Sequence, residues 1–113
     1  MGELSRDDIY KLNKYLVETI LDKRKTIEAK ISKVSYLIRL GADLNDDDKV
    51  GETILFWASA GGYKEMVELM LQNGVNINAK DNKGNTALAI AFMAGNMDIV
   101  DLLKKYKNEV VKK

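Results

Sequence analysis

The sequence contains no cysteine and no histidine, and each absence bears on a class of function. Without cysteine the chain has no disulfide framework, which suits the cytosol. Without histidine it cannot assemble a serine or cysteine triad with a histidine base, or the usual zinc sites. The commonest catalytic and metal-binding arrangements are therefore excluded.

The chain also lacks an excess of either charge and any long apolar run. Lys and Arg number 18 against 17 Asp and Glu, so the basic surplus typical of nucleic-acid binders is missing. No apolar segment approaches the roughly 20 residues needed to cross a bilayer, and because the N-terminus is acidic and polar we do not expect it to be a signal peptide. We expect a cytoplasmic or other intracellular protein with no nucleic-acid or membrane partner.

What the chain does have is an internal repeat. Compared with itself at an offset of thirty-three residues, it shows a run of identical positions, and such a period is typical of repeat architectures. The identical pairs are Asp48 and Asp81, Gly51 and Gly84, Thr53 and Thr86, Leu55 and Leu88, Ala58 and Ala91, Gly62 and Gly95, Val67 and Val100, and Leu69 and Leu102.

Each copy predicts two helices separated by turns. Thr53 is the expected N-cap of a helix over residues 54–60, and a second helix over residues 64–73 ends before Gly74 in a left-handed conformation. Residues 81–84 predict a tight turn. The second copy repeats this arrangement with Thr86 as the cap and a last helix from Met97 to about residue 106.

At these residues the sequence resembles the ankyrin-repeat family. An Asp-x-x-Gly-x-Thr pattern ends at Thr53 and at Thr86, and versions of Gly-Ala-Asp-x-Asn begin at Gly41 and Gly74. The resemblance covers about residues 34–103. The sequence departs from the family at the Thr-Pro-Leu-His motif: residues 53–56 read Thr-Ile-Leu-Phe, and residues 86–89 read Thr-Ala-Leu-Ala. The resemblance implies an all-α helical solenoid with two full repeats, an N-terminal capping helix pair and short β-hairpin-like fingers.

Near the N-terminus the first expected helix does not keep the repeat register, whereas the second does. We expect a helix over residues 6–21, started by a capping pattern of Ser5 and Asp8, and a second helix over residues 27–40. The charged residues 22–25 between them predict an exposed turn, although one continuous helix over residues 6–40 remains an alternative. We expect one domain over residues 1–113, with a capping segment 1–25, a partial repeat 26–47 and repeats 48–80 and 81–113.

Apolar residues at helical spacing predict which side chains are buried. In the first helix Ile9, Leu12, Leu16 and Ile20 form a stripe that Tyr10, Val17 and Leu21 would widen. Later in the chain we expect Met66, Met70 and Trp57 in the core. Phe92 occupies the position of Ser59 with no further repeat to cover it, which leaves its burial open.

The acidic segment Asp43–Asp48 is the nearest approach to a metal site. Its oxygen ligands alternate as in a calcium loop, but Asp48 replaces the sixth-position glycine and Ile54 the twelfth-position glutamate. We therefore expect no metal and no cofactor. Paired carboxylates such as Asp47 and Glu52 are read as surface charge, and the chain lacks a glycine-rich phosphate loop, so we predict no catalytic residues and no enzyme.

We expect a monomer, and the resemblance implies a protein-binding module that uses a concave face of finger tips and first helices. Two alternatives remain: a small inhibitor or immunity-like regulator of one enzyme, or a fragment of a larger ankyrin protein. The acidic segment would attract a basic partner. The partner-binding residues that we predict are Asp46, Asp47, Lys49, Val50, Glu52, Ala60, Gly61, Asn82, Lys83, Asn85, Met93 and Ala94.

Overall fold

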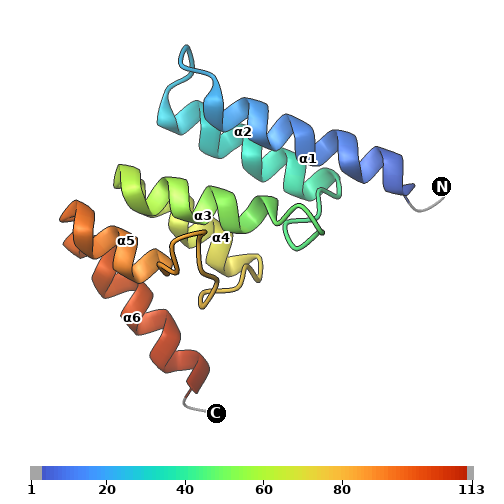
Figure 1. The fold of residues 1–113 in the computed structure, drawn as a ribbon. Coiled ribbons are helices and arrows are strands. Elements are labelled where there is room, and N and C mark those ends of the chain that lie inside the picture. Colours follow the sequence, from blue (N-terminus) through green and yellow to red (C-terminus); the bar gives the residue numbers. More distant parts are fainter. Residues whose placement is uncertain (1–3, 112–113) are drawn as a thin grey trace. The chain divides into compact units, whose positions relative to one another are not determined.

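The computed structural model describes the backbone of residues 4–111 and the side chains of residues 4–107. Within that range the chain is mainly helical, and it divides into two compact units, residues 1–51 and residues 52–113, with the boundary in the first turn of α3. The helices are α1 (Arg6–Leu21), α2 (Ile27–Leu40), α3 (Val50–Gly61), α4 (Lys64–Gln72), α5 (Ala87–Ala94) and α6 (Met97–Val111) (Figure 1).

The first unit is built on α1 and α2, which run antiparallel beside each other (Figure 1). A capping box starts α1: the Ser5 hydroxyl accepts from the Asp8 N–H at 3.1 Å, and the Asp8 carboxylate accepts from the Ser5 N–H at 3.2 Å. Thr26 caps α2 through the Ala29 N–H at 3.1 Å. Both helices have the predicted bounds, and Gly41 ends α2 in a left-handed conformation with φ 117°.

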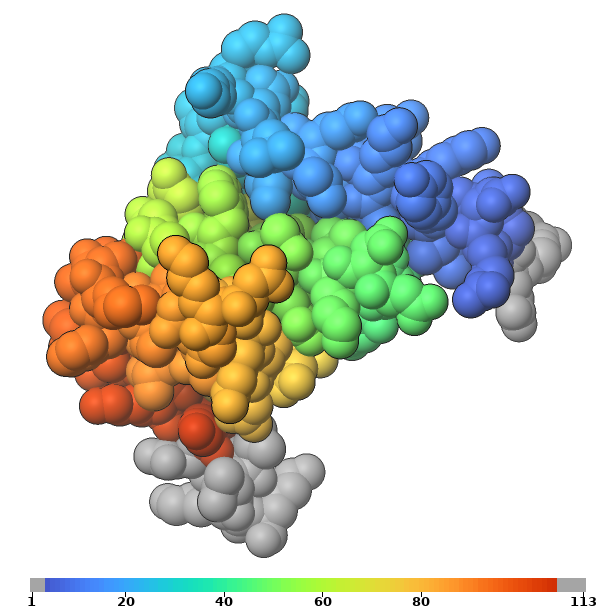
Figure 2. All heavy atoms as spheres, in the orientation of Figure 1, coloured from blue at the N-terminus to red at the C-terminus, as the bar shows by residue number. Residues whose placement is uncertain are grey.

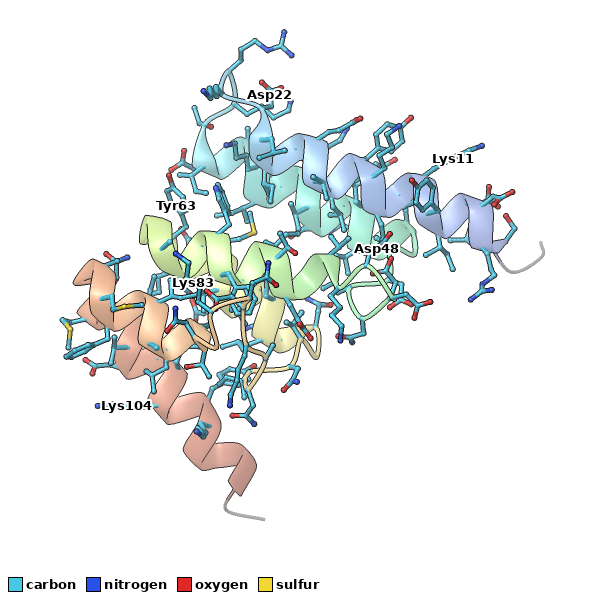
Figure 3. All side chains as sticks on the ribbon, viewed as in Figure 1. Lys11, Asp22, Asp48, Tyr63, Lys83 and Lys104 are labelled. Atoms are coloured by element: carbon cyan, nitrogen blue, oxygen red, sulfur yellow. The ribbon has the colours of Figure 1, made fainter. Side chains whose placement is uncertain are left out.

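The alternative of one continuous helix is wrong because the chain turns after α1. The Asp22 carboxylate accepts from the Arg24 backbone N–H at 3.0 Å and from its guanidinium at 3.1 Å, and this local pairing favours a turn over a helix. Residues 23–25 are exposed, as predicted. Figure 3 shows Asp22 at this turn, so the charges of the segment stay in water.

The buried stripe of α1 is narrower than we predicted. Leu16 is fully buried and Ile20 is 3% exposed, but Tyr10 and Leu21 are 60% and 65% exposed. The prediction that the last two widen the stripe is therefore wrong. Asn13 takes a place on the buried side instead, at 2% exposure.

The second unit contains α4, α5, α6 and most of α3. Its core includes six large, fully buried side chains, and the predicted core positions Met66 and Met70 are among them. Trp57 was expected in the core as well, but it is only partly buried, with its ring 4.8 Å from that of Tyr63. The large buried residues are Ile54, Leu55, Met66, Met70, Ile99 and Leu103.

The segment before α5 forms a short closed turn. Residues 80–86, called the finger below, are closed by an antiparallel bridge between Lys80 and Thr86, an isolated pair rather than a sheet among the described residues. The Gly84 N–H donates to the Asp81 carbonyl at 3.0 Å, and Gly84 adopts φ 83°. Thr86 caps α5 through the Ala89 N–H at 3.2 Å, as predicted.

The equivalent segment of the preceding repeat folds differently. The helix starts at Val50 and not after Thr53, so Thr53 is not its N-cap. A turn closed by the Lys49 N–H on the Asp46 carbonyl at 2.9 Å, with Lys49 at φ 54°, leads directly into α3. Burial of Val50, which is 5% exposed, and the acidic Glu52 in the first turn favour the earlier start.

The last helix extends beyond its predicted end, to Val111. Lys104, Lys105 and Lys107 are exposed on it, and Figure 3 shows Lys104 projecting away from the helix. No helix within residues 4–111 combines the length and the apolar character needed to span a membrane.

Candidate functional site

A groove of about 540 Å³ lies in the second unit and is called the groove below. Three segments line it: the exposed side of α3, the finger and the exposed side of α5. In Figure 2 the golden-orange finger stands beside the orange α5 on the visible face. The lining residues are Phe56, Trp57, Ala60, Asp81, Asn82, Lys83, Asn85, Ile90 and Met93.

One wall of the groove is the finger, which Asp81 holds in shape. Its carboxylate Oδ1 accepts from the backbone N–H groups of Lys83 and Asn85, both at 2.9 Å. These hydrogen bonds, that of Asn85 first, lower the pKa of Asp81 below its ordinary value of 3.8. The Asp81 carboxylate is thus occupied by its own turn, while the Lys83 side chain is exposed (Figure 3).

The remainder of the groove is mostly apolar. Phe56, Trp57 and Ile90 are partly buried, and Met93 is 66% exposed. The Trp57 ring packs at a tilt of 34° against that of Tyr63, the N-cap residue of α4. Aromatic and methionine side chains presented in this way are enriched at protein interfaces.

Five of the predicted partner-binding residues come together here. Ala60 and Met93 lie on the first helices of their repeats, and Asn82, Lys83 and Asn85 lie on the finger. Gly61 and Ala94 are exposed at the ends of the same helices but do not line the groove.

The residues predicted for the preceding repeat do not lie together on a finger. Lys49 is exposed, but Val50 is buried at 5% exposure, so the prediction that Val50 points to solvent at a finger tip is wrong. Glu52 is partly buried within the first turn of α3. Both residues were placed on a finger that the early start of the helix replaces.

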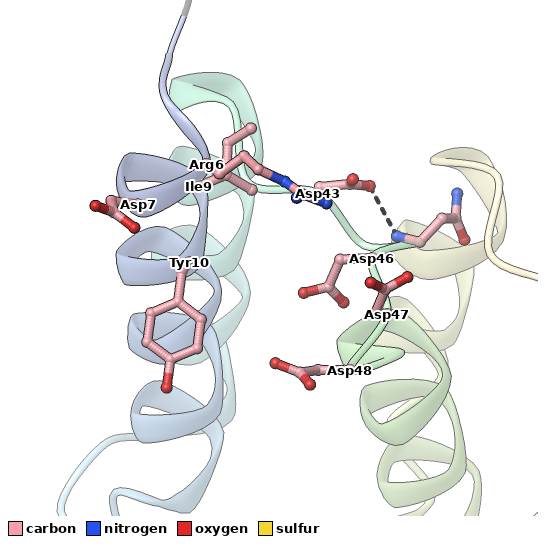
Figure 4. A pocket seen from close by; sticks show the side chains of 9 residues that line it. Arg6, Asp7, Ile9, Tyr10, Asp43, Asp46, Asp47 and Asp48 are labelled. Atoms are coloured by element: carbon pink, nitrogen blue, oxygen red, sulfur yellow. Dashed lines mark hydrogen bonds between the residues drawn. The ribbon is translucent and has the colours of Figure 1, made fainter.

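The predicted acidic residues Asp46 and Asp47 line a separate hollow of about 540 Å³ in the first unit, called the acidic hollow below. Figure 4 shows Asp46 and Asp48 with their carboxylates directed toward α1. Asp47 and Asp48 are exposed, whereas Asp46 is partly buried. The other lining residues are Arg6, Asp7, Ile9, Tyr10, Asp43 and Asn45.

Asp46 is held by Asn13, a residue that the sequence analysis missed. The Asn13 amide donates to Asp46 Oδ2 at 2.7 Å and to the Asp43 carbonyl at 2.9 Å. Its position offered a signal, because a polar residue between Leu12 and Leu16 on an apolar stripe needs a buried hydrogen-bond partner. The main role of Asp46 is therefore to position the loop. The accessible negative charge of the loop is carried by Asp47 and Asp48.

Exposed apolar side chains also gather where α5 ends and α6 begins. Phe92, Met93 and Met97 are 64%, 66% and 49% exposed. The thirty-three-residue register pairs Phe92 with Ser59, which is fully buried. The open question of Phe92 is thus answered: it is exposed.

Comparison with known proteins gives one family assignment. The model for ankyrin repeats, in three copies, matches residues 25–113, which is most of the chain. No curated protein matches the sequence.

Proposed function

The chain belongs to the ankyrin-repeat family, whose repeats are generally protein–protein interaction modules, and we propose that this protein binds a protein partner through the groove. The finger tip and the first helices α3 and α5 form its contact surface. The proposed role is non-catalytic and needs no cofactor. It fits an intracellular module, including one that regulates a single enzyme by covering it.

The observation that supports this proposal is that apolar and polar side chains from three segments line one groove. Apolar side chains of α3 and α5 face the same space as the polar finger. An apolar centre with a polar rim is the usual composition of a protein interface. The finger keeps its shape through Asp81, so its side chains can change without disturbing the core.

We propose a secondary contribution from the acidic hollow. Asp47 and Asp48 are exposed, and they line the hollow together with Asp46 and Asp7. Exposed charges of one sign act mainly on the association rate. Raising the salt concentration should therefore slow capture of a basic partner more than it speeds release.

Partner capture with matched variants tests the proposal. The wild-type protein is used to capture its partner from the native cell, and the capture is repeated with Met93→Glu and with Met97→Glu. Both residues are exposed methionines, but only Met93 lines the groove. Met93→Glu should lose capture at an unchanged melting temperature, and Met97→Glu should retain it. Equal capture by both variants would place the binding face elsewhere.

A further inference from the structure

The polar wall and the apolar side of the groove together select a class of partner. We infer that the groove takes a protein segment in which a large apolar side chain stands next to an aspartate or glutamate. The inference rests on the proposed function and deepens it, because it names the chemistry of the segment that the groove binds.

The apolar half of the segment follows from the groove's side chains. Phe56, Trp57 and Ile90 retain exposed surface, and Met93 is mostly exposed. A leucine, methionine or phenylalanine side chain placed against them removes apolar area from water on both partners. Met93 is flexible and adapts to more than one such shape.

The acidic half follows from the charges of the groove. Asp81 and Lys83 are the charged residues among its lining, and they are not equivalent. Asp81 is partly buried, and its Oδ1 already accepts two backbone N–H groups within the finger. The charge of Lys83 helps to lower the pKa of nearby Asp81, but Lys83 forms no ion pair with the described part of the chain and its side chain is exposed.

The amides of the finger support the same choice. Asn82 is exposed and Asn85 is partly buried, and both line the groove on the same wall as Lys83. A carboxylate at this wall can accept from the lysine ammonium and from an amide N–H, and hydrogen bonds to ionised groups are stronger than neutral ones. A basic side chain would meet the like charge of the exposed Lys83 ammonium. The wall therefore discriminates against basic segments as well as favouring acidic ones.

Selection from a random peptide library displayed on phage tests this inference without an identified partner. The wild-type protein should select peptides with Asp or Glu adjacent to a large apolar residue. Lys83→Glu should shift the selection to Lys or Arg at that position. Lys80→Glu makes the same change on the same finger at an exposed residue outside the groove, and it should select as the wild type does.

The sole tryptophan of the chain reports binding directly, since Trp57 lines the groove. A synthetic peptide from the wild-type selection should change the Trp57 emission, and Lys83→Glu should weaken its affinity about tenfold or more. Unchanged melting temperatures would confirm that the variants are folded. Peptides without acidic enrichment, an unaltered selection by Lys83→Glu, or binding without a change in emission would each overturn the inference.

Failure of this inference is distinguishable from failure of the proposed function. If Met93→Glu loses the captured partner but the library yields no acidic–apolar peptide, the groove binds protein by other chemistry. If Met93→Glu retains the partner, the groove itself is the wrong surface.

Discussion

Asn13 and Asp43 are joined by two hydrogen bonds across thirty positions of the chain. The Asn13 amide N–H donates to the Asp43 carbonyl at 2.9 Å, and the Asp43 N–H donates to Asn13 Oδ1 at 3.0 Å. The same amide also donates a hydrogen bond to the Asp46 carboxylate, which joins a second residue of the loop to α1. The buried Asn13 side chain thereby satisfies the backbone N–H and the backbone carbonyl of Asp43, which lies in a loop outside any helix.

Replacing Asn13 by alanine should destabilise the protein by about 1–3 kcal/mol, because the Asp43 N–H and carbonyl lose their buried partner. Urea unfolding followed by far-ultraviolet circular dichroism measures the change. Lys14→Ala, an exposed neighbour on the same helix, is the control and should stay within about 0.5 kcal/mol of the wild type. Equal stability of the two variants would show that the Asn13 bonds contribute nothing.

The helices of the first unit could be predicted from sequence because their signals are local. Ser5 and Asp8 lie three residues apart and bond reciprocally, and Thr26 and Gly41 mark the start and end of α2. The start of α3 could not be predicted in this way. The repeat register placed Val50 on a finger, but its burial depends on the folded surroundings, which the register does not contain.

The groove could be predicted only in part, because the repeat register does not contain the folded surroundings of each residue. Register transfer identified its polar wall and Met93, because those positions follow directly from the repeat. It missed Phe56 and Ile90 and assigned Trp57 to the core. Helical spacing indicates which residues share a face, but it does not show how far a neighbouring segment covers that face.

Ser59 gives a prediction of increased stability. It is fully buried, and its hydroxyl has no hydrogen-bond partner among the described residues. Burying an unpaired hydroxyl is unfavourable, and alanine is the better helix former, so Ser59→Ala should stabilise the protein by about 1 kcal/mol. Denaturant unfolding checks this. A loss of stability in Ser59→Ala would mean that the hydroxyl has a partner after all.

The position that corresponds to Ser59 in the next repeat should tolerate change. Phe92 is 64% exposed, so Phe92→Ser should alter the free energy of unfolding by no more than about 0.5 kcal/mol. The reverse exchange, Ser59→Phe, should destabilise by about 1–3 kcal/mol or prevent folding, because that site is filled. Melting temperatures of the two variants test the pair. A large loss in Phe92→Ser would show that Phe92 packs against the protein.

The finger should contribute stability that depends on pH. The backbone hydrogen bonds of Asn85 and Lys83 lower the pKa of Asp81 below 3.8 in the folded state, so the unfolded state binds more protons as the pH falls. The stabilisation that Asp81 contributes is fully present well above pH 3.8. It is lost as the pH falls through the lowered pKa that Asp81 has in the folded state.

Asp81→Asn separates this charge effect from the shape of the finger, since an amide oxygen can still accept the two N–H groups. The variant should be less stable than the wild type at neutral pH, and the difference should shrink below about pH 4. Urea unfolding over a series of pH values measures it. Asp101→Asn, which removes an exposed carboxylate from α6, is the matched control. A gap between wild type and Asp81→Asn that stays constant down to the lowest pH would exclude the charge of Asp81 as its cause.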